Sequence, residues 1–275
     1  MSGCADLVVA MSSMRRRWTK PMELPKTPTF RLDGRRALVT GAGRGIGLAA
    51  AAALSEAGAT VTLSARTTSE IEEVAAAIVA DGGRANAITL DVTDIDVARS
   101  TITNTGPYDI LVNNAGTNRP KTMADTTADD YDAIMDLNLR AAYFVAQAVT
   151  DGLLKAGKSG SVINMSSQMG HVGGPNRTVY CTSKWGLEGM TKAMALEFAS
   201  HGIRVNSIGP TFIETPLAKS FLAQKEMNDY VMSKIKLGRI GQVEDLMGAI
   251  VFLASDAAAL ITGAALLIDG GWTIG

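Results

Sequence analysis

Tyr180 and Lys184 are separated by three residues in the stretch "VYCTSKWG". On a helix, residues four positions apart lie on the same face, one turn from each other. A free tyrosine has a pKa of about 10, and a nearby ammonium group favours the phenolate and lowers that value. The pair therefore predicts a proton donor with its activator. A Y-x-x-x-K pair can also occur by chance on a helix surface, so the choice depends on whether the chain also supplies a cofactor site and an oxyanion partner.

A glycine-rich turn, "TGAGRGIG" (Thr40–Gly47), follows a short apolar stretch and precedes a helical pattern. Glycines allow a sharp turn and let a pyrophosphate approach the helix N-terminus, where free N–H groups attract anions. The spacing G-x-x-x-G-x-G, at Gly41, Gly45 and Gly47, differs from the G-x-G-x-x-G of the common dinucleotide fingerprint. Its place between the first strand and the first helix favours a dinucleotide site over a merely structural turn.

Apolar strands and helical patterns alternate from Arg31 to the end of the chain. The predicted strands are Arg36–Thr40, Thr60–Ser64, Arg84–Asp91, Asp109–Gly116, Gly160–Ser167, Gly202–Pro210 and Ala265–Asp269. Helices are predicted over Ile46–Ala57, Ser69–Gly83, Asp94–Gly106, Asp129–Lys155 and from near Tyr180 to Ala199. Such alternation predicts an α/β protein, a single-domain doubly wound Rossmann-type fold with a seven-stranded parallel sheet flanked by helices. Ligands bind such sheets beyond the carboxyl ends of the strands.

The first 29 residues differ from the rest in composition, and we expect a flexible extension over 1–29 followed by one catalytic domain over 30–275. The arginine run Arg15–Arg17 follows the apolar patch Leu7–Met11, which is the reverse of the order in an export signal. Met22 is an alternative start.

Bulk composition excludes several classes of function. The formal net charge is −1, hydrophobic residues make up 47% of the chain, and no apolar run is long enough to span a bilayer. Two cysteines, Cys4 and Cys181, and two histidines, His171 and His201, make a disulfide framework or a zinc site improbable. We therefore expect a cytoplasmic protein that binds no metal, no nucleic acid and no membrane.

The second strand bears on the choice of nucleotide. NAD sites tend to carry an acid there, whereas Ser64, Ala65 and Arg66 offer a cation, and Arg44 in the glycine turn adds another. Two guanidinium groups suit a 2′-phosphate, so NADP is predicted, with NAD as the alternative. Asp91 is expected to contact the adenine ring or, alternatively, to cap the helix that follows.

Together these residues resemble the short-chain dehydrogenase/reductase family, in particular its single-domain ketoacyl reductases and sugar-acid dehydrogenases. The resemblance covers Phe30 to Gly275. It rests on the ordered motifs "TGAGRGIG", "DV" at Asp91, "NNAG" at Asn113, Asn138, the serine pair, "YCTSK" and "DGGW". The resemblance favours the reading of Tyr180 and Lys184 as part of an active site.

The resemblance implies a catalytic set of Asn138, Ser167, Tyr180 and Lys184. Tyr180 would protonate the carbonyl oxygen during reduction, or remove the alcohol proton during oxidation. Lys184 would lower the phenol's pKa and hold the nicotinamide ribose, and Ser167, thirteen residues before the tyrosine, would hydrogen-bond the substrate oxygen. Asn138 would anchor a water next to Lys184 in a proton relay.

The resemblance also implies that Asn114, Ala115 and Gly116 line the adenosine half of the cofactor and that Ile213 and Thr215 contact its carboxamide and pyrophosphate. With the glycine turn and the residues named above, the predicted cofactor contacts are Gly41, Arg44, Gly45, Ile46, Gly47, Arg66, Asp91, Val92, Asn114, Ala115, Gly116, Tyr180, Lys184, Ile213 and Thr215. One departure is visible, because the family usually reads Pro-Gly after the sixth strand and this chain reads Pro210-Thr211. The added side chain is expected to narrow the turn and alter the local substrate pocket.

Substrate choice in the family depends on residues near the serine and on the segment before the last strand. The candidates here are Gln168, Met169, His171, Asn176, Phe212 and the helical stretch 214–235, with His171 either a substrate contact or a solvated turn residue.

The leading hypothesis for the reaction is oxidation of a small polar secondary alcohol, a sugar acid or polyol, or reduction of the corresponding ketone. The alternative is a 3-oxoacyl-[acyl-carrier-protein] reductase, for which Lys155 and Lys158 could form part of a basic patch although His201 stands where another cation is expected. A nucleotide-sensing regulator would typically lack the tyrosine or the lysine. The apolar surface of the two long helices, 129–155 and 182–199, predicts a homotetramer.

Overall fold

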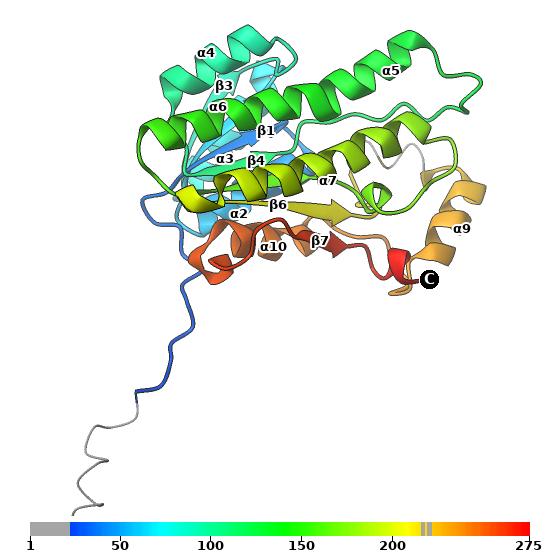
Figure 1. Cartoon of the computed structure of the whole chain (residues 1–275). Helices are drawn as coiled ribbons and strands as arrows, with labels where there is room; N and C mark the ends of the chain where they lie inside the picture. Colours follow the sequence, from blue (N-terminus) through cyan, green and yellow to red (C-terminus); the bar gives the residue numbers. More distant parts are fainter. Residues whose placement is uncertain (1–22, 216–217, 219–221) are drawn as a thin grey trace, which may run out of the picture.

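The computed structural model describes residues 23–215, 218 and 222–275, and its centre is one seven-stranded sheet flanked by helices (Figure 1). The strands lie in the order β3-β2-β1-β4-β5-β6-β7, and every pairing is parallel. The strands are β1 (Arg36–Thr40), β2 (Thr60–Ala65), β3 (Arg84–Thr89), β4 (Ile110–Asn113), β5 (Gly160–Met165), β6 (Ile203–Pro210) and β7 (Ala265–Ile268). This confirms the predicted seven-stranded Rossmann-type sheet.

Helices cover both faces of this sheet, and each face has its own hydrophobic core. The helices are α2 (Gly45–Glu56), α3 (Thr68–Ala80), α4 (Ile95–Thr105), α5 (Ala128–Met135), α6 (Ala142–Lys155), α7 (Thr178–Phe198), α9 (Lys225–Lys234) and α10 (Glu244–Ala254). One core lies under α2, α3 and α10, and the other lies under α4, α6 and α7. In β1, Val39 enters the first core and its neighbour Leu38 the second, because successive strand residues point to opposite faces.

The long helix predicted over 129–155 contains a π-helical segment, Asp136–Ala141, between α5 and α6. A π-helix widens the hydrogen-bond step from four residues to five, and such segments recur at functional sites. The segment carries the buried side chain of Asn138. The hydrophobic pattern of the sequence continues through this segment without a break, so the pattern predicted a single α-helix.

The predicted N-terminal extension is described only in part, because residues 1–22, including Cys4 and Met22, lie outside the described residues. Glu23 to Thr29 are exposed and form neither helix nor strand (Figure 1). Contact with the body of the protein begins at Phe30, whose ring lies 6.2 Å from that of Phe252. Of the predicted helical stretch 214–235, residues 216–217 and 219–221 also lie outside the described part, and α9 confirms a helix over residues 225–234.

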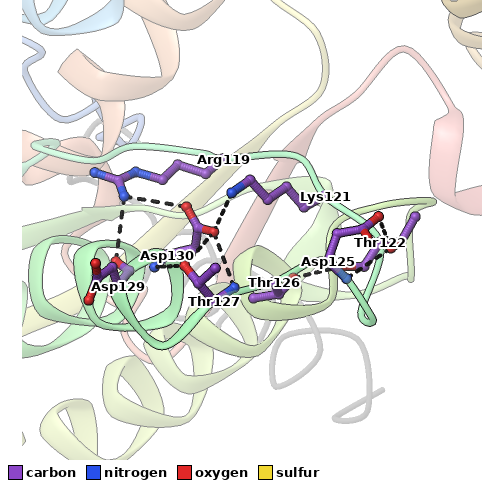
Figure 2. A network of polar contacts seen from close by, with 8 residues as sticks. All are labelled: Arg119, Lys121, Thr122, Asp125, Thr126, Thr127, Asp129 and Asp130. Atoms are coloured by element: carbon purple, nitrogen blue, oxygen red, sulfur yellow. Dashed lines mark hydrogen bonds and ion pairs between the residues drawn. The ribbon is translucent and has the colours of Figure 1, made fainter.

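A network of polar contacts ties the loop after β4 to the start of α5 (Figure 2). The side chain of Asp130 is buried and accepts hydrogen bonds from the backbone N–H and hydroxyl of Thr127, at 3.2 and 2.8 Å. Thr127 in return accepts from the Asp130 N–H, which completes a capping box. Lys121 and Arg119 contact the same carboxylate at 2.5 and 3.4 Å. The loop that borders the active-site region is therefore fastened at its far end by one carboxylate.

We expect Asp130→Asn to lower the melting temperature at pH 7 by several degrees. Hydrogen bonds from Lys121 and Thr127 hold the pKa of Asp130 well below its ordinary value. A depressed folded-state pKa contributes stability that is complete above the unfolded pKa, about 3.9, and is lost as the pH falls through the folded pKa. The gap between variant and wild type should therefore shrink below about pH 4. Thermal unfolding from pH 7 to pH 3 checks this, with Asp129→Asn as the control, and a gap that stays constant with pH would contradict it.

Candidate active site

A cleft of about 460 Å³ lies at the carboxyl ends of the central strands. It is lined by all the predicted cofactor residues except Gly47, namely Gly41, Arg44, Gly45, Ile46, Arg66, Asp91, Val92, Asn114, Ala115, Gly116, Tyr180, Lys184, Ile213 and Thr215. Ser166 and Ser167 line it as well, so residues far apart in the chain meet at the edge where a parallel sheet is expected to bind ligands.

The glycine turn forms a cradle between β1 and α2. Gly41 and Gly45 have φ angles of +64° and +56°, in the left-handed region that other residues avoid. Arg44 is the N-cap of α2 but makes no side-chain capping hydrogen bond, and the first turn carries no acid. The N-terminus of α2 is thus suited to an anion such as a pyrophosphate.

Gly47 does not line the cleft, although the sequence predicted a cofactor contact. Its backbone is buried, and a Cβ there would overlap the carbonyl oxygen of Gly41. Gly47 therefore shapes the cradle by letting α2 approach the turn closely. Asn114, at the end of β4, fastens the same turn from the other side, because its Nδ2 donates to the carbonyl oxygens of Thr40 and Gly41 at 3.0 and 3.2 Å.

Two arginines and two acids surround the end of β2. Arg66 is exposed and lines the cleft. The pKa of Asp91 lies below its ordinary value, mainly because Thr93 donates hydrogen bonds to the carboxylate and to a smaller extent because of the positive charge of Arg66. Arg44 lies 3.3 Å from Glu70, an acid of the first turn of α3 that the sequence analysis did not single out. The positive charge of Arg44 and Arg66, which the sequence predicted here, is thus partly neutralised by the carboxylate of Glu70.

Asp91 lines the cleft and is oriented by its own turn. Its Oδ1 accepts hydrogen bonds from the backbone N–H and the hydroxyl of Thr93, at 2.9 and 2.7 Å. The alternative that Asp91 caps the following helix is wrong, because the N-cap of α4 is Asp94, which accepts from the Val97 N–H.

Tyr180 and Lys184 lie one turn apart near the start of α7, and both face the cleft. The Lys184 ammonium is buried, donates a hydrogen bond to the carbonyl oxygen of Met165 at 2.8 Å and lies 5.7 Å from the centre of the Tyr180 ring. Burial lowers the pKa of Lys184 to about 8, and the negative charge of Glu188 opposes that shift. Lys184 therefore stays mostly charged near neutral pH.

The pKa of Tyr180 moves in the direction opposite to the prediction. Burial raises it above the ordinary value, while hydrogen bonding with Ser167 and the charge of Arg177 lower it by less. The expected lowering by Lys184 is wrong for the protein as it stands, because desolvation of the phenol outweighs the nearby charges. Tyr180 is therefore a neutral phenol near neutral pH, the form that can donate a proton.

Ser167 lines the cleft together with Tyr180, and its predicted hydrogen bond to the substrate oxygen stays a prediction. It directly follows the end of β5, beyond Met165 and Ser166. Its hydroxyl donates to Gln168 Oε1 at 2.8 Å and accepts from the Met169 N–H at 3.1 Å. Both contacts orient the Ser167 oxygen at the cleft wall.

Asn138 lies behind the cleft wall and does not line it. Its Oδ1 accepts from the Thr117 N–H at 2.7 Å, and its Nδ2 donates to the Thr117 carbonyl at 2.9 Å and to Ser183 Oγ at 3.1 Å. It thus joins the π-helical segment, the loop after β4 and α7. Its predicted part in a water-mediated proton relay stays a prediction.

The predicted substrate residues divide into two groups. Gln168, Met169 and Phe212 line the cleft, whereas His171 and Asn176 are not among its lining residues. His171 Nε2 lies 3.3 Å from Glu188 Oε1. The ring therefore has a protein neighbour and is not simply solvated, and its part as a substrate contact stays a prediction.

Glu188 is buried one turn beyond Lys184 and was missed by the sequence analysis. Its Oε2 accepts a hydrogen bond from Ser207 Oγ at 2.7 Å. The spacing Tyr180, Lys184, Glu188 continues the same helix face and could have indicated it. Arg177 and Asn118 also line the cleft and were missed, since they belong to no motif that the resemblance covers.

Within the described residues there is no group of three or more His, Cys, Asp or Glu side chains that could hold a metal ion. Across the same part of the chain, none of the helices has the length and hydropathy that crossing a membrane requires.

Comparison with known proteins gives consistent results. The family model described as enoyl-(acyl carrier protein) reductase matches residues 41–273. The chain is 36% identical over 249 residues to gluconate 5-dehydrogenase of Gluconobacter oxydans (strain 621H), covering 89% of this chain and 97% of that protein. It is 37% identical over 243 residues to L-xylulose reductase of Bos taurus, covering 88% and 98%.

A solved structure adds a bound cofactor to the comparison. The gluconate 5-dehydrogenase of Burkholderia cenocepacia J2315, in complex with NADP and tartrate, superposes with a TM-score of 0.86 at 36% identity. The match covers 90% of this chain and 98% of that one.

Proposed function

The chain belongs to the short-chain dehydrogenase/reductase family of oxidoreductases, and on that premise we propose that it interconverts a secondary alcohol and a ketone on a small sugar acid or polyol. The observation that carries the proposal is the meeting of Ser167, Tyr180 and Lys184 in one cleft with the glycine cradle. A bound nicotinamide dinucleotide would supply the hydride for reduction or accept it in oxidation.

In the reduction direction Tyr180 gives its proton to the substrate oxygen. The raised pKa of Tyr180 keeps the phenol protonated until the oxygen develops negative charge. Ser167 donates a second hydrogen bond to that oxygen, for which its hydroxyl must leave Gln168 Oε1. The Lys184 ammonium then stabilises the phenolate that remains, because opposite charges attract strongly where water is excluded.

Asn138 is proposed as a positioning residue for this step. It links the loop after β4 to Ser183, the residue before Lys184. Through these hydrogen bonds Asn138 holds the turn of α7 that carries Lys184 in place against the loop after β4. The relay of the Tyr180 proton to solvent through a water near Asn138 remains part of the proposal.

NADP is the proposed cofactor. Arg66 lies where an NAD-specific acid would be expected and is free of any resolved ion pair in the described residues, while Arg44 shares its charge with Glu70. The glycine cradle at the N-terminus of α2 would hold the pyrophosphate. Of the solved relatives, the Burkholderia enzyme was found with NADP, which supports the same choice here.

The sugar acid or polyol substrate is supported by the names of the relatives, gluconate 5-dehydrogenase and L-xylulose reductase. The alternative of a 3-oxoacyl-[acyl-carrier-protein] reductase is not favoured. Its basic patch would need Lys155 and Lys158, but these pair with Asp151 and Asp109 at 2.7 and 3.2 Å. A regulator without turnover would not need the intact tyrosine and lysine.

A homotetramer in the cytoplasm is the proposed state of the enzyme, with residues 30–275 as its catalytic domain. Large apolar side chains exposed on the α5–α6 pair and on α7 support the assembly, because burying them between subunits would remove them from water. They are Tyr131, Tyr143, Leu154, Trp185 and Leu196. The scarcity of cysteine supports a reducing compartment.

The proposed function is tested by following nicotinamide absorbance with NADP⁺ or NADPH against sugar acids, polyols, ketoses and acyl thioesters. We expect turnover of at least one sugar acid, polyol or ketose. Turnover confined to acyl thioesters would support the alternative. Tight NADPH binding without turnover of any compound would favour a regulator and contradict the proposal.

Arg66→Asp tests the proposed cofactor. The carboxylate removes a cation and repels a 2′-phosphate, so the Kd for NADPH should rise at least tenfold while the Kd for NADH falls or stays unchanged. Fluorescence titration with both cofactors measures this, and NADH serves as the internal control for folding. An unchanged ratio of the two Kd values would contradict the NADP assignment.

A further inference from the structure

We propose that Arg177 binds a carboxylate group of the substrate, so that the enzyme acts on sugar acids in preference to the neutral polyols of the same length. This inference rests on the proposed function, because it concerns the same cleft. It narrows the substrate class that the comparison leaves open between gluconate and xylulose chemistry.

Arg177 is a buried cation placed beside the reacting groups. It is 5% exposed, lines the cleft and precedes Tyr180 by three residues at the N-cap of α7. Three residues apart at the start of a helix, the two side chains lie on the same face, and both line the cleft. A guanidinium that lines a cleft at this depth interacts more strongly with an anion there than an exposed guanidinium would, because less water screens the two charges.

The orientation of Arg177 is set by an aromatic stack. Its guanidinium carbon lies 5.9 Å from the centre of the Phe212 ring. Phe212 stacks on Trp272 at 5.8 Å, and Trp272 meets the edge of Tyr230 at 5.9 Å. A guanidinium fixed against such a stack loses little freedom when it binds a carboxylate through two parallel hydrogen bonds.

The two ends of the cleft differ in charge, because the acids that line it lie at one end, where Arg44 and Arg66 balance them. The acids among its described lining residues, Glu70 and Asp91, both lie at the end where β2 and β3 finish. The catalytic end carries Arg177 and Lys184 and, among the described lining residues, no acid. This end is therefore complementary to an anion.

Two other cations of this region do not face the cleft. Arg119 and Lys121, on the loop after β4, both contact Asp130 (Figure 2). Neither is among the residues that line the cleft. Arg177 is thus better placed than either to meet a substrate carboxylate.

Two further atoms at the cleft wall fit the hydroxyl groups of a sugar acid. Thr211 Oγ1 and Asn118 Oδ1 are hidden from solvent and have no hydrogen-bond partner among the described residues. Both residues line the cleft, and Thr211 directly precedes Phe212. Buried polar atoms are normally paired, so their arrangement indicates a polar ligand. Thr211 also stands where the family usually has the glycine of a Pro-Gly pair. The catalytic residues give no reason for a threonine there, whereas a hydrogen bond to a substrate hydroxyl does.

The test compares aldonates of four to six carbons with the alditols that carry a CH₂OH group in place of the carboxylate. The ratio of kcat/KM for the acid to kcat/KM for the alditol is measured with NADP⁺ for wild type, Arg177→Gln, Arg177→Lys and Thr211→Val. We expect a wild-type ratio above one for at least one pair. Arg177→Gln should lower that ratio at least tenfold, mainly through KM, and Arg177→Lys should recover part of it. Thr211→Val should lower kcat/KM for acid and alditol alike and leave the ratio near that of wild type, because both compounds carry the hydroxyl groups that Thr211 would meet.

Arg99→Gln is the matched control, because Arg99 is exposed and contacts Gln147 outside the cleft, and its ratio should equal that of wild type. A wild-type preference for the alditols, or a ratio within twofold of wild type in Arg177→Gln, would overturn the inference and leave the proposed function standing. If Arg177→Gln loses NADPH binding through misfolding, Arg177→Met, which keeps an unbranched side chain without the charge, is measured in its place and its ratio decides in the same way. Absence of turnover by wild type with every acid, alditol, ketose and thioester would instead overturn the proposed function itself.

Discussion

The burial of the Lys184 ammonium beside a tyrosine is the constraint on which the active-site arrangement depends. A charged group inside a protein must be paired, and three groups from two elements surround this one: the carbonyl oxygen of Met165 at the end of β5, the Tyr180 ring one turn earlier on α7 and the carboxylate of Glu188 one turn later. The parallel sheet makes this possible, because it brings the ends of β1, β4 and β5 to the same edge. The glycine cradle and the proton donor therefore open into one cleft.

The cations at the two ends of that cleft differ in burial, and this suits them to different parts of the ligands. At one end the uncapped N-terminus of α2 and the exposed Arg66 suit phosphate groups, which keep part of their hydration. At the other end Arg177 and Lys184 are buried, so each interaction with an anion or a developing negative charge is stronger than it would be in water. The exposed end of the cleft therefore suits cofactor binding, and the buried end suits the proton transfer.

The sequence predicted what depends on local pattern. The strands were legible because both faces of the sheet are covered, which makes residues such as Leu38 and Val39 apolar alike. The spacing of residues alone predicted the glycine turn and the helix face that Tyr180 and Lys184 share. Tertiary effects were not: the π-helical segment around Asn138 leaves the hydrophobic pattern intact, and the upward shift of the Tyr180 pKa comes from burial by distant parts of the chain. The partnership of His171 with Glu188 joins residues that no motif connects.

The central claim is that the Tyr180 hydroxyl transfers the proton while Lys184 stabilises the resulting phenolate. Tyr180→Phe removes only that oxygen, and single-turnover oxidation of NADPH by a ketose or keto acid measures the chemical step. The account predicts a rate lower by at least about 10²-fold, with NADPH binding and the melting temperature close to those of wild type. A variant that folds, binds NADPH and reduces substrate at the wild-type rate would contradict it.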